Sequence, residues 1–415
     1  MKTMKWKFYS LAFVAGMSIL TACSSDDNND NDGNDGNGNG NEIENGTILK
    51  GTITSDVTLA AGNTYKLSGE YIVEEGATLH IEEGVKIIAV YDDIADYILV
   101  KQGGKINAVG TPDKPIVMTS EKEEPGAWGG IHICGRAHTN AEGGKGSSEI
   151  GGAVYGGNDD ADNSGTLQYI RLEYTGFAFD EEHEANGISF YGVGNGTIVD
   201  HCQAYKGSDD GFEFFGGSVN VSNLVAVSCS DDSFDWTEGW NGKGTNLVAY
   251  QEAESTLGYD CDCLMECDNN GNNFGATPVA HPVIANATLV GNGGSKQGVR
   301  LRAGTQVELY NAIITGKGQP LTVETVETEN ALKDGTSKLE YVVISDLLNS
   351  KENIYTNDLF AAGNGNATQH TANLSDLYVG TEEGGKDLST DEFFTATNYK
   401  GAVQADDNWT AGWTL

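Results

Sequence analysis

The sequence predicts an all-β fold, a solenoid of the parallel β-helix type, on three observations. Residues 208–214 (SDDGFEF) return 22 residues later as residues 230–236 (SDDSFDW), and a repeat this short is one unit that must stack on its neighbours. Both copies carry aromatic residues at alternate positions, the pattern of a strand with one buried face. The 56 glycines, the 6 prolines and the lack of long helical periodicity favour short strands joined by tight turns.

The N-terminus has the pattern of a targeting segment, residues 1–22. Three lysines precede an apolar core at residues 11–20 that is too short to span a bilayer comfortably. The segment leads through LTA to Cys23, which resembles a bacterial lipoprotein cleavage site. The resemblance implies cleavage before Cys23 and lipid on its sulfur and amine, so that the protein is anchored rather than spanning. An ordinary secretory signal with an unrelated cysteine is the alternative.

Residues 23–46 begin with Cys23 and continue as a low-complexity stretch rich in Asn, Asp and Gly. It has almost no apolar side chains, so we expect a disordered tether. Its acidic start at residues 24–27 (SSDD) resembles signals that send some Gram-negative lipoproteins to the outer face of the outer membrane. We therefore expect an outer-membrane lipoprotein exposed on the cell surface, with the periplasmic face as the alternative.

The chain is strongly acidic, with a net charge of −37 that lies mostly outside the tether. Such a surface repels phosphate backbones, so nucleic acid is not an expected partner. It suits cations, or neutral and basic ligands.

Residues 47–340 are predicted to form the β-helix. Residues 110–120 (GTPDKPIVMTS), followed by WGGI at residues 128–131, closely resemble the entry coils of bacterial right-handed β-helix proteins. The resemblance implies a right-handed coil and says little about activity. Residues 137–165 are rich in Gly, Asn and Asp and are predicted to form a long loop that leaves the coil.

Polar residues that precede short apolar runs predict a ladder of sharp bends. They are Asp200, Asn223, Asn246, Asn286 and Asn311, at spacings of 23, 23, 40 and 25 residues. Asn tolerates the left-handed conformation that such a bend needs, and stacked amides can bond from coil to coil. The long spacing predicts a large insertion in one coil.

Aligning the coils predicts two inward columns on one face, with an outward column between them. The inward columns are Ile188, Phe212, Phe234, Met265, Val299 and Leu321, and Phe190, Phe214, Trp236, Cys267, Leu301 and Val323. The outward column is Ser189, Glu213, Asp235, Glu266, Arg300 and Thr322. Beyond the coils, residues 341–415 are expected to hold the last strands and a cap, with the tail at residues 398–413 closing the open end.

This alignment places an acidic ladder on the outside of the coils. It consists of Asp209, Asp210, Glu213, Asp231, Asp232, Asp235, Asp262 and Glu266. Successive coils stack about 4.8 Å apart, and like charges directly opposite each other destabilise a sheet.

Three effects are able to offset this repulsion. They are shared protons with raised pKa values, pairing with Lys296 and Arg300, or a bound calcium ion, which takes about six to eight oxygen ligands. The oxygen-rich loop at residues 268–273 (DNNGNN) resembles a calcium loop in part but lacks the terminal Glu of such loops. Solvated acids with a salt bridge to Arg300 are the alternative.

Catalysis on a polysaccharide is a second class of function. Residues 207–211 (GSDDG) superficially resemble the aspartate pair of polygalacturonase-type hydrolases, but the Asn-Thr-Asp, Gly-His-Gly and Arg-Ile-Lys signatures of those enzymes are missing. A calcium-dependent lyase would need a basic residue beside the metal, for which Arg300 is the candidate, yet the acidic body is wrong for a polyanion. No catalytic residue is assigned.

Binding is the function that we favour. Exposed aromatic side chains stack on sugar rings, and Trp240 and Phe179, which fall in predicted loops, are the candidates. Trp236 and Phe214 are expected in the core.

Six cysteines follow Cys23. They are Cys134, Cys202, Cys229, Cys261, Cys263 and Cys267. In an exported protein one or two disulfides are favoured over a metal–thiolate site, because no histidine pair follows at suitable spacing.

From about residue 100 onward the chain resembles a family of uncharacterised bacterial surface β-helix lipoproteins. The resemblance rests on WGGI at residues 128–131, YGGNDD at 155–160, SDDGFEFFGG at 208–217 and DDSFDWT at 231–237. It implies the fold and the location and no particular reaction. Such lipoproteins often accompany outer-membrane uptake systems, so a non-catalytic binding or accessory protein for a glycan or nutrient is expected, with an adhesin or scaffold as the alternative.

Overall fold

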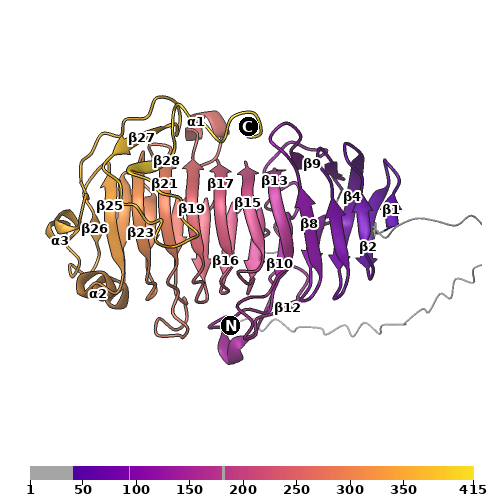
Figure 1. The fold of residues 1–415 in the computed structure, drawn as a ribbon, viewed down its shortest axis with the longest axis horizontal. Coiled ribbons are helices and arrows are strands. Elements are labelled where there is room, and N and C mark those ends of the chain that lie inside the picture. The colour runs from indigo at the N-terminus through magenta and orange to yellow at the C-terminus, as the bar shows by residue number, and fades with distance from the viewer. Residues whose placement is uncertain (1–40, 93, 180–182) are drawn as a thin grey trace, which may run out of the picture. The chain divides into compact units, whose positions relative to one another are not determined.

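The computed structural model describes residues 41–415 except 93 and 180–182. The predicted signal peptide, Cys23 and the tether up to residue 40 lie outside the described residues. The described chain is a solenoid in which 24 strands form one continuous, all-parallel sheet (Figure 1). This confirms the predicted parallel β-helix. Among the described residues, no helix is long and apolar enough to cross a bilayer.

The first coils are built from short strands. They are β1 (Asn41–Ile43), β2 (Ile48–Ile53), β3 (Val57–Leu59), β4 (Thr64–Val73), β5 (Thr78–Ile81), β6 (Lys86–Ala89), β7 (Tyr97–Val100), β8 (Lys105–Val109), β9 (Ile116–Ser120) and β10 (Ile131–Cys134). β1 pairs with β3, so the sheet begins inside the predicted tether of residues 23–46. Residues 41–43 are mostly polar and exposed, so their composition does not predict a strand. The strand forms through backbone pairing with β3.

Later coils repeat a three-sided plan. A long strand bends in its middle and so contributes to two faces, and a short strand forms the third, the ladder face. The bent strands are β13 (Gly165–Glu173), β15 (Ile198–Tyr205), β17 (Asn220–Val227), β19 (Lys243–Tyr250), β21 (Val283–Val290), β23 (Glu308–Thr315) and β25 (Lys338–Ile344). The ladder face continues from β10 through β14 (Ile188–Tyr191), β16 (Phe212–Phe215), β18 (Phe234–Thr237), β20 (Met265–Cys267), β22 (Gln297–Leu301), β24 (Gln319–Val323) and β26 (Asn349–Ser350).

A left-handed residue makes the bend in each long strand. These residues are Tyr169, His201, Asn223, Asn246, Asn286, Asn311 and Tyr341, with φ between 50° and 58°. The four predicted asparagines are confirmed, and the prediction for Asp200 is wrong by one residue. Asp200 remains paired with Ser222 of the next coil and accepts a hydrogen bond from the Ser222 hydroxyl at 2.8 Å. The bend itself is made by His201.

The predicted columns of the ladder face are confirmed by the strand register. Ile188 pairs with Phe212 and Phe212 with Phe234, and the rings of Phe212 and Phe234 stack with centroids 5.6 Å apart. The outward column runs from Ser189 through Glu213, Asp235, Glu266 and Arg300 to Thr322, each opposite the next. Stacked aromatic rings therefore fill the coil directly beneath the acidic residues.

Helices and loops extend from the coils of the solenoid at three places. Residues 137–165 carry η1 (Glu142–Gly144) and the antiparallel pair β11 (Gly146–Ser147) and β12 (Val154–Tyr155). The insertion after β19 holds α1 (Glu254–Leu257). α2 (Val326–Asp334) and α3 (Asn357–Ala362) cover the last coil, where Leu332 and Phe360 join the core.

The C-terminal tail does not close the open end as predicted. β28 (Tyr399–Val403) pairs antiparallel with β27 (Gly380–Glu383) and packs across β19, β21 and β23 (Figure 1). The chain end then reaches back to β15, where the Leu415 amide donates to Gln203 Oε1 at 2.9 Å. Apolar side chains on the outside of the bent strands, such as Val225 and Val248, hold this strap of residues 378–415 through Trp413.

We expect the stacked aromatic column to be a main source of stability. Replacing Phe212 by Ala leaves a cavity between Ile188 and Phe234 and should lower the free energy of unfolding by about 3–5 kcal/mol. Ile198→Ala, at a side chain that is 55% exposed, is the control and should change it by less than about 0.5 kcal/mol. Thermal unfolding of both variants measures the difference, and equal melting temperatures would contradict the role of the column.

Candidate functional site

The repeated Ser-Asp-Asp turn places carboxylates where they bond the next coil. Asp210 Oδ1 accepts from the Asp232 amide at 2.8 Å, and Asp232 Oδ1 accepts from the Cys263 amide at 2.6 Å. Ser230 Oγ donates to the Ser208 carbonyl at 2.7 Å in the same turn. The repeat in the sequence is therefore a repeated hydrogen-bond pattern that carries one coil onto the next.

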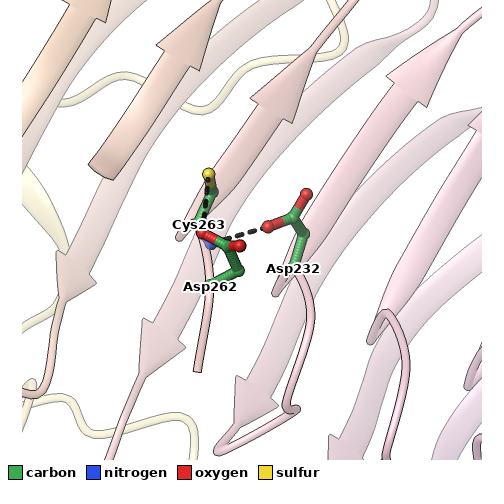
Figure 2. Close-up of side chains that lie close together, drawn as sticks. All are labelled: Asp232, Asp262 and Cys263. Atoms are coloured by element: carbon green, nitrogen blue, oxygen red, sulfur yellow. Dashed lines mark hydrogen bonds between the residues drawn. The ribbon is translucent and has the colours of Figure 1, made fainter. Parts of the chain in front are cut away.

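Carboxyl groups crowd together along this edge and the adjoining strand. Four groups of three acidic or thiol side chains have ligand atoms within 4.8 Å of one another: Asp209, Asp210 and Asp231; Asp210, Glu213 and Asp235; Asp232, Asp235 and Glu266; and Asp232, Asp262 and Cys263. Figure 2 shows the last group, with Asp232 turned toward the Cys263 amide and the Cys263 thiol donating to Asp262 at 3.6 Å. The structure therefore brings all eight predicted ladder residues together.

Burial shifts the protonation of the ladder. It raises the pKa of Asp209 to about 8, and the neighbouring charge of Asp231 adds to the shift. Burial and neighbouring carboxylates likewise hold the pKa values of Asp210, Glu213, Asp232 and Asp235 well above their usual range. An Asn186 amide that donates to Glu213 at 2.5 Å favours the charged form of that residue and is outweighed.

Basic side chains neutralise only one end of the ladder. Arg300 bridges Glu266 at 2.8 Å and Glu324 at 3.2 Å, Arg302 bridges Asp268 at 2.7 Å and Glu266 at 3.2 Å, and Lys296 pairs with Asp262 at 3.2 Å. Among the ion pairs of the described residues, none includes the other six ladder acids: Asp209, Asp210, Glu213, Asp231, Asp232 and Asp235. The predicted pairing with Arg300 and Lys296 therefore exists, and it leaves the centre of the ladder without a basic partner.

Two loops cover the ladder from the N-terminal side. Glu149, from the loop of residues 137–165, accepts from the Tyr191 hydroxyl at 3.4 Å and adds its charge to those of Asp209 and Glu213. Asn186 borders the same edge, where its Oδ1 accepts from the Asp210 amide at 3.2 Å. Asp231 remains exposed, so solvent reaches the ladder at this turn. No pattern in the sequence places Glu149 or Asn186 here, because neither belongs to a coil repeat.

The prediction that Trp240 is an exposed ligand-binding residue is wrong. Its side chain is 1% exposed, its ring stacks on Phe214 at 4.2 Å, and its Nε1 donates to the Val219 carbonyl at 3.1 Å. The turn after β18 folds inward, so that the Trp240 indole becomes part of the hydrophobic core. Trp236 and Phe214 are buried as expected. Phe179 is 40% exposed, and its ring forms an edge-to-face contact with Tyr97. It therefore stays a candidate for stacking on a sugar.

The predicted disulfides are not present among the described residues. All six cysteines after Cys23 are free and buried. Cys202, Cys229 and Cys267 lie in the main core, where a thiol acts as a small apolar side chain.

One comparison with known proteins gives a match over most of the chain. The family model for the pectate-lyase-like β-helix domain matches residues 51–414. No curated protein and no solved structure matches.

The raised pKa values predict that the metal-free protein loses stability as pH rises from about 4 to 8. In this range the folded ladder holds protons that the unfolded chain has released, so each such group lowers the free energy of unfolding by up to about 1.4 kcal/mol per pH unit. Asp209→Asn should flatten the decline in melting temperature. Asp113→Asn, which removes the same charge at an exposed position, should leave the slope unchanged. Identical slopes in the two variants would contradict the buried protons.

Proposed function

This chain belongs to the pectate-lyase-like β-helix domain family, and we propose that it is a non-catalytic polysaccharide-binding protein whose acidic ladder holds calcium. The family and the fold fit a protein that binds or acts on polysaccharides. The observation that carries the calcium proposal is the crowding of carboxyl oxygens from Asp210, Glu213 and Asp235 within 4.8 Å of one another, where neither Arg300 nor Arg302 forms an ion pair with them.

The donor set suits a hard divalent cation. Calcium binds carboxylate and carbonyl oxygens in flexible geometry, with about six to eight ligands. Asp210, Glu213 and Asp235 offer oxygens from two successive coils, and Asp209 and Asp231 offer more at the exposed edge. A bound cation would remove the repulsion that otherwise keeps protons on these groups.

Anchoring at the cell surface completes the proposal. Lipid on Cys23 would hold the protein in the outer membrane, and the polar tether would let the solenoid reach material outside the cell. The partners are then a glycan, bound with the help of Phe179, and an outer-membrane uptake complex. The acidic surface makes nucleic acid an unsuitable partner.

A lyase mechanism is disfavoured by the state of the basic residues. Arg300 and Arg302 are both held by two carboxylates, so neither is free to act as a base. A hydrolase is the second candidate, because Asp209 keeps its proton to about pH 8 beside the exposed Asp231. A protonated acid next to an ionised carboxylate is the pair that glycoside hydrolysis uses.

We predict that calcium stabilises the protein. Adding calcium to protein stripped with EDTA should raise the melting temperature, and a concentration of about 100 Kd corresponds to about 2.7 kcal/mol. Asp235→Asn removes a carboxylate shared by two of the four groups and should abolish most of this shift. Asp113→Asn should keep it. A melting temperature that is the same in EDTA and in calcium would rule out the metal.

Binding without turnover is the second expected outcome. The protein should be retained on at least one insoluble polysaccharide from a panel of pectin, xylan, starch, mannan and cellulose, without release of reducing ends or unsaturated products. Phe179→Ala should weaken retention several-fold, whereas Phe274→Ala, at a side chain that is 39% exposed in another loop, should not. Product formation that Asp232→Ala abolishes would establish an enzyme instead.

A further inference from the structure

A second site lies on the side of the solenoid where the long strands bend. A groove of about 320 Å³ separates the bends of β17 and β19 from the C-terminal strap. Its walls include Asn223 and Asn246 on the coils and Tyr399, Gln404, Asp407 and Trp409 on the strap. The volume falls within the range of small-molecule sites, roughly 300–1,000 Å³. The acidic ladder belongs to another face of the coil and contributes no residue to this groove.

The strap satisfies two rungs of the bend ladder. The Asn286 amide donates to the carbonyls of Tyr399 and Gly401 at 3.2 and 3.1 Å. Asn311 donates to the Lys386 carbonyl at 2.9 Å and accepts from the Lys386 amide at 2.7 Å. At these two bends, the side-chain amides of Asn286 and Asn311 therefore form hydrogen bonds with backbone groups of the strap.

The next two rungs are different. Asn223 and Asn246 adopt the same left-handed conformation, are half-buried and line the groove, and neither side chain forms a hydrogen bond with any described residue. The backbone does not require asparagine here, because His201, Tyr169 and Tyr341 make the same bend in other coils. Two amides therefore present donors and acceptors to the groove that the fold itself does not use.

The opposite wall supplies a flat apolar surface and further polar groups. Trp409 is fixed by its Nε1, which donates to the Ala402 carbonyl at 2.9 Å, and by an edge contact with His201 at 5.7 Å. Tyr399, Gln404 and Asp407 add a hydroxyl, an amide and a carboxylate. An aromatic ring that lines the same groove as amides and a carboxylate matches the chemistry of a sugar, which has an apolar ring face and hydroxyls around its edge.

We propose that this groove binds a neutral sugar. The described residues that line it include no lysine, arginine or histidine, and Asp407 would repel the carboxylate of a uronic acid. The assignment stands independently of calcium in the acidic ladder. It gives the protein a contact to a neutral glycan on a different face from the ladder.

Calorimetric titration of the full chain with neutral disaccharides (maltose, cellobiose, lactose, mannobiose and xylobiose) and with digalacturonate tests the site. We expect at least one neutral disaccharide to bind and digalacturonate not to bind. Asn246→Gly keeps the left-handed bend because glycine adopts it without steric cost, and Gln404→Ala shortens the opposite wall. Each should weaken binding about tenfold.

Two controls separate this groove from other sites. Asn353→Gly changes an exposed, equally left-handed asparagine outside the groove, and Asp113→Asn removes an exposed carboxylate outside it; both should leave the affinity unchanged. The proposal is overturned if no neutral disaccharide binds, if digalacturonate binds equally well, or if Asn246→Gly and Gln404→Ala have no effect. Binding that is lost only in Phe179→Ala would overturn the groove while supporting the glycan contact proposed at Phe179.

Discussion

Stacking of coils in strict register is the constraint on which the rest of this structure depends. Parallel pairing places each side chain about 4.8 Å from its counterpart in the next coil, so a residue is chosen largely by how well it tolerates a copy of itself. Phe212 above Phe234 and Asn286 beside Asn311 tolerate it well, through ring stacking and an amide hydrogen bond at 3.4 Å. Glu213 opposite Asp235 does not, and the protein must supply protons or a cation to keep them there.

Register explains why much of the fold could be predicted from the sequence. The columns through Ile188, Phe212 and Phe234 follow from two signals in the sequence. Apolar residues alternate with polar ones along each strand, and the pattern returns after the length of one coil, so both signals can be found within a short stretch of sequence. The bend position is harder to predict from the sequence, because His201 makes the bend as well as asparagine does and Asp200 beside it is polar too. Residue type alone does not fix a left-handed position to better than one residue.

The parts outside the repeat could not be predicted in the same way. Trp240 lies in a turn whose inward path depends on Phe214 beneath it, a contact between different coils. The identity of the ladder residues follows from the register, whereas their protonation depends on burial beneath loops, including Glu149, that have no coil periodicity. The strap is apolar and packs on the flank of the solenoid, where it buries valines on the outside of the bent strands such as Val225 and Val248.

The strap also changes how the solenoid must fold. In a simple repeat array each coil contacts only its neighbours, so coils form in sequence and fray from either end. Here the last residue of the chain bonds to Gln203, which lies 212 positions earlier, and Trp413 packs on Tyr169. These contacts of very high sequence separation form only once the strap is present, so they couple β13 and β15 to residues near the C-terminal end of the strap. The coils of these two strands therefore reach their final packing only after the strap of residues 378–415 has been made.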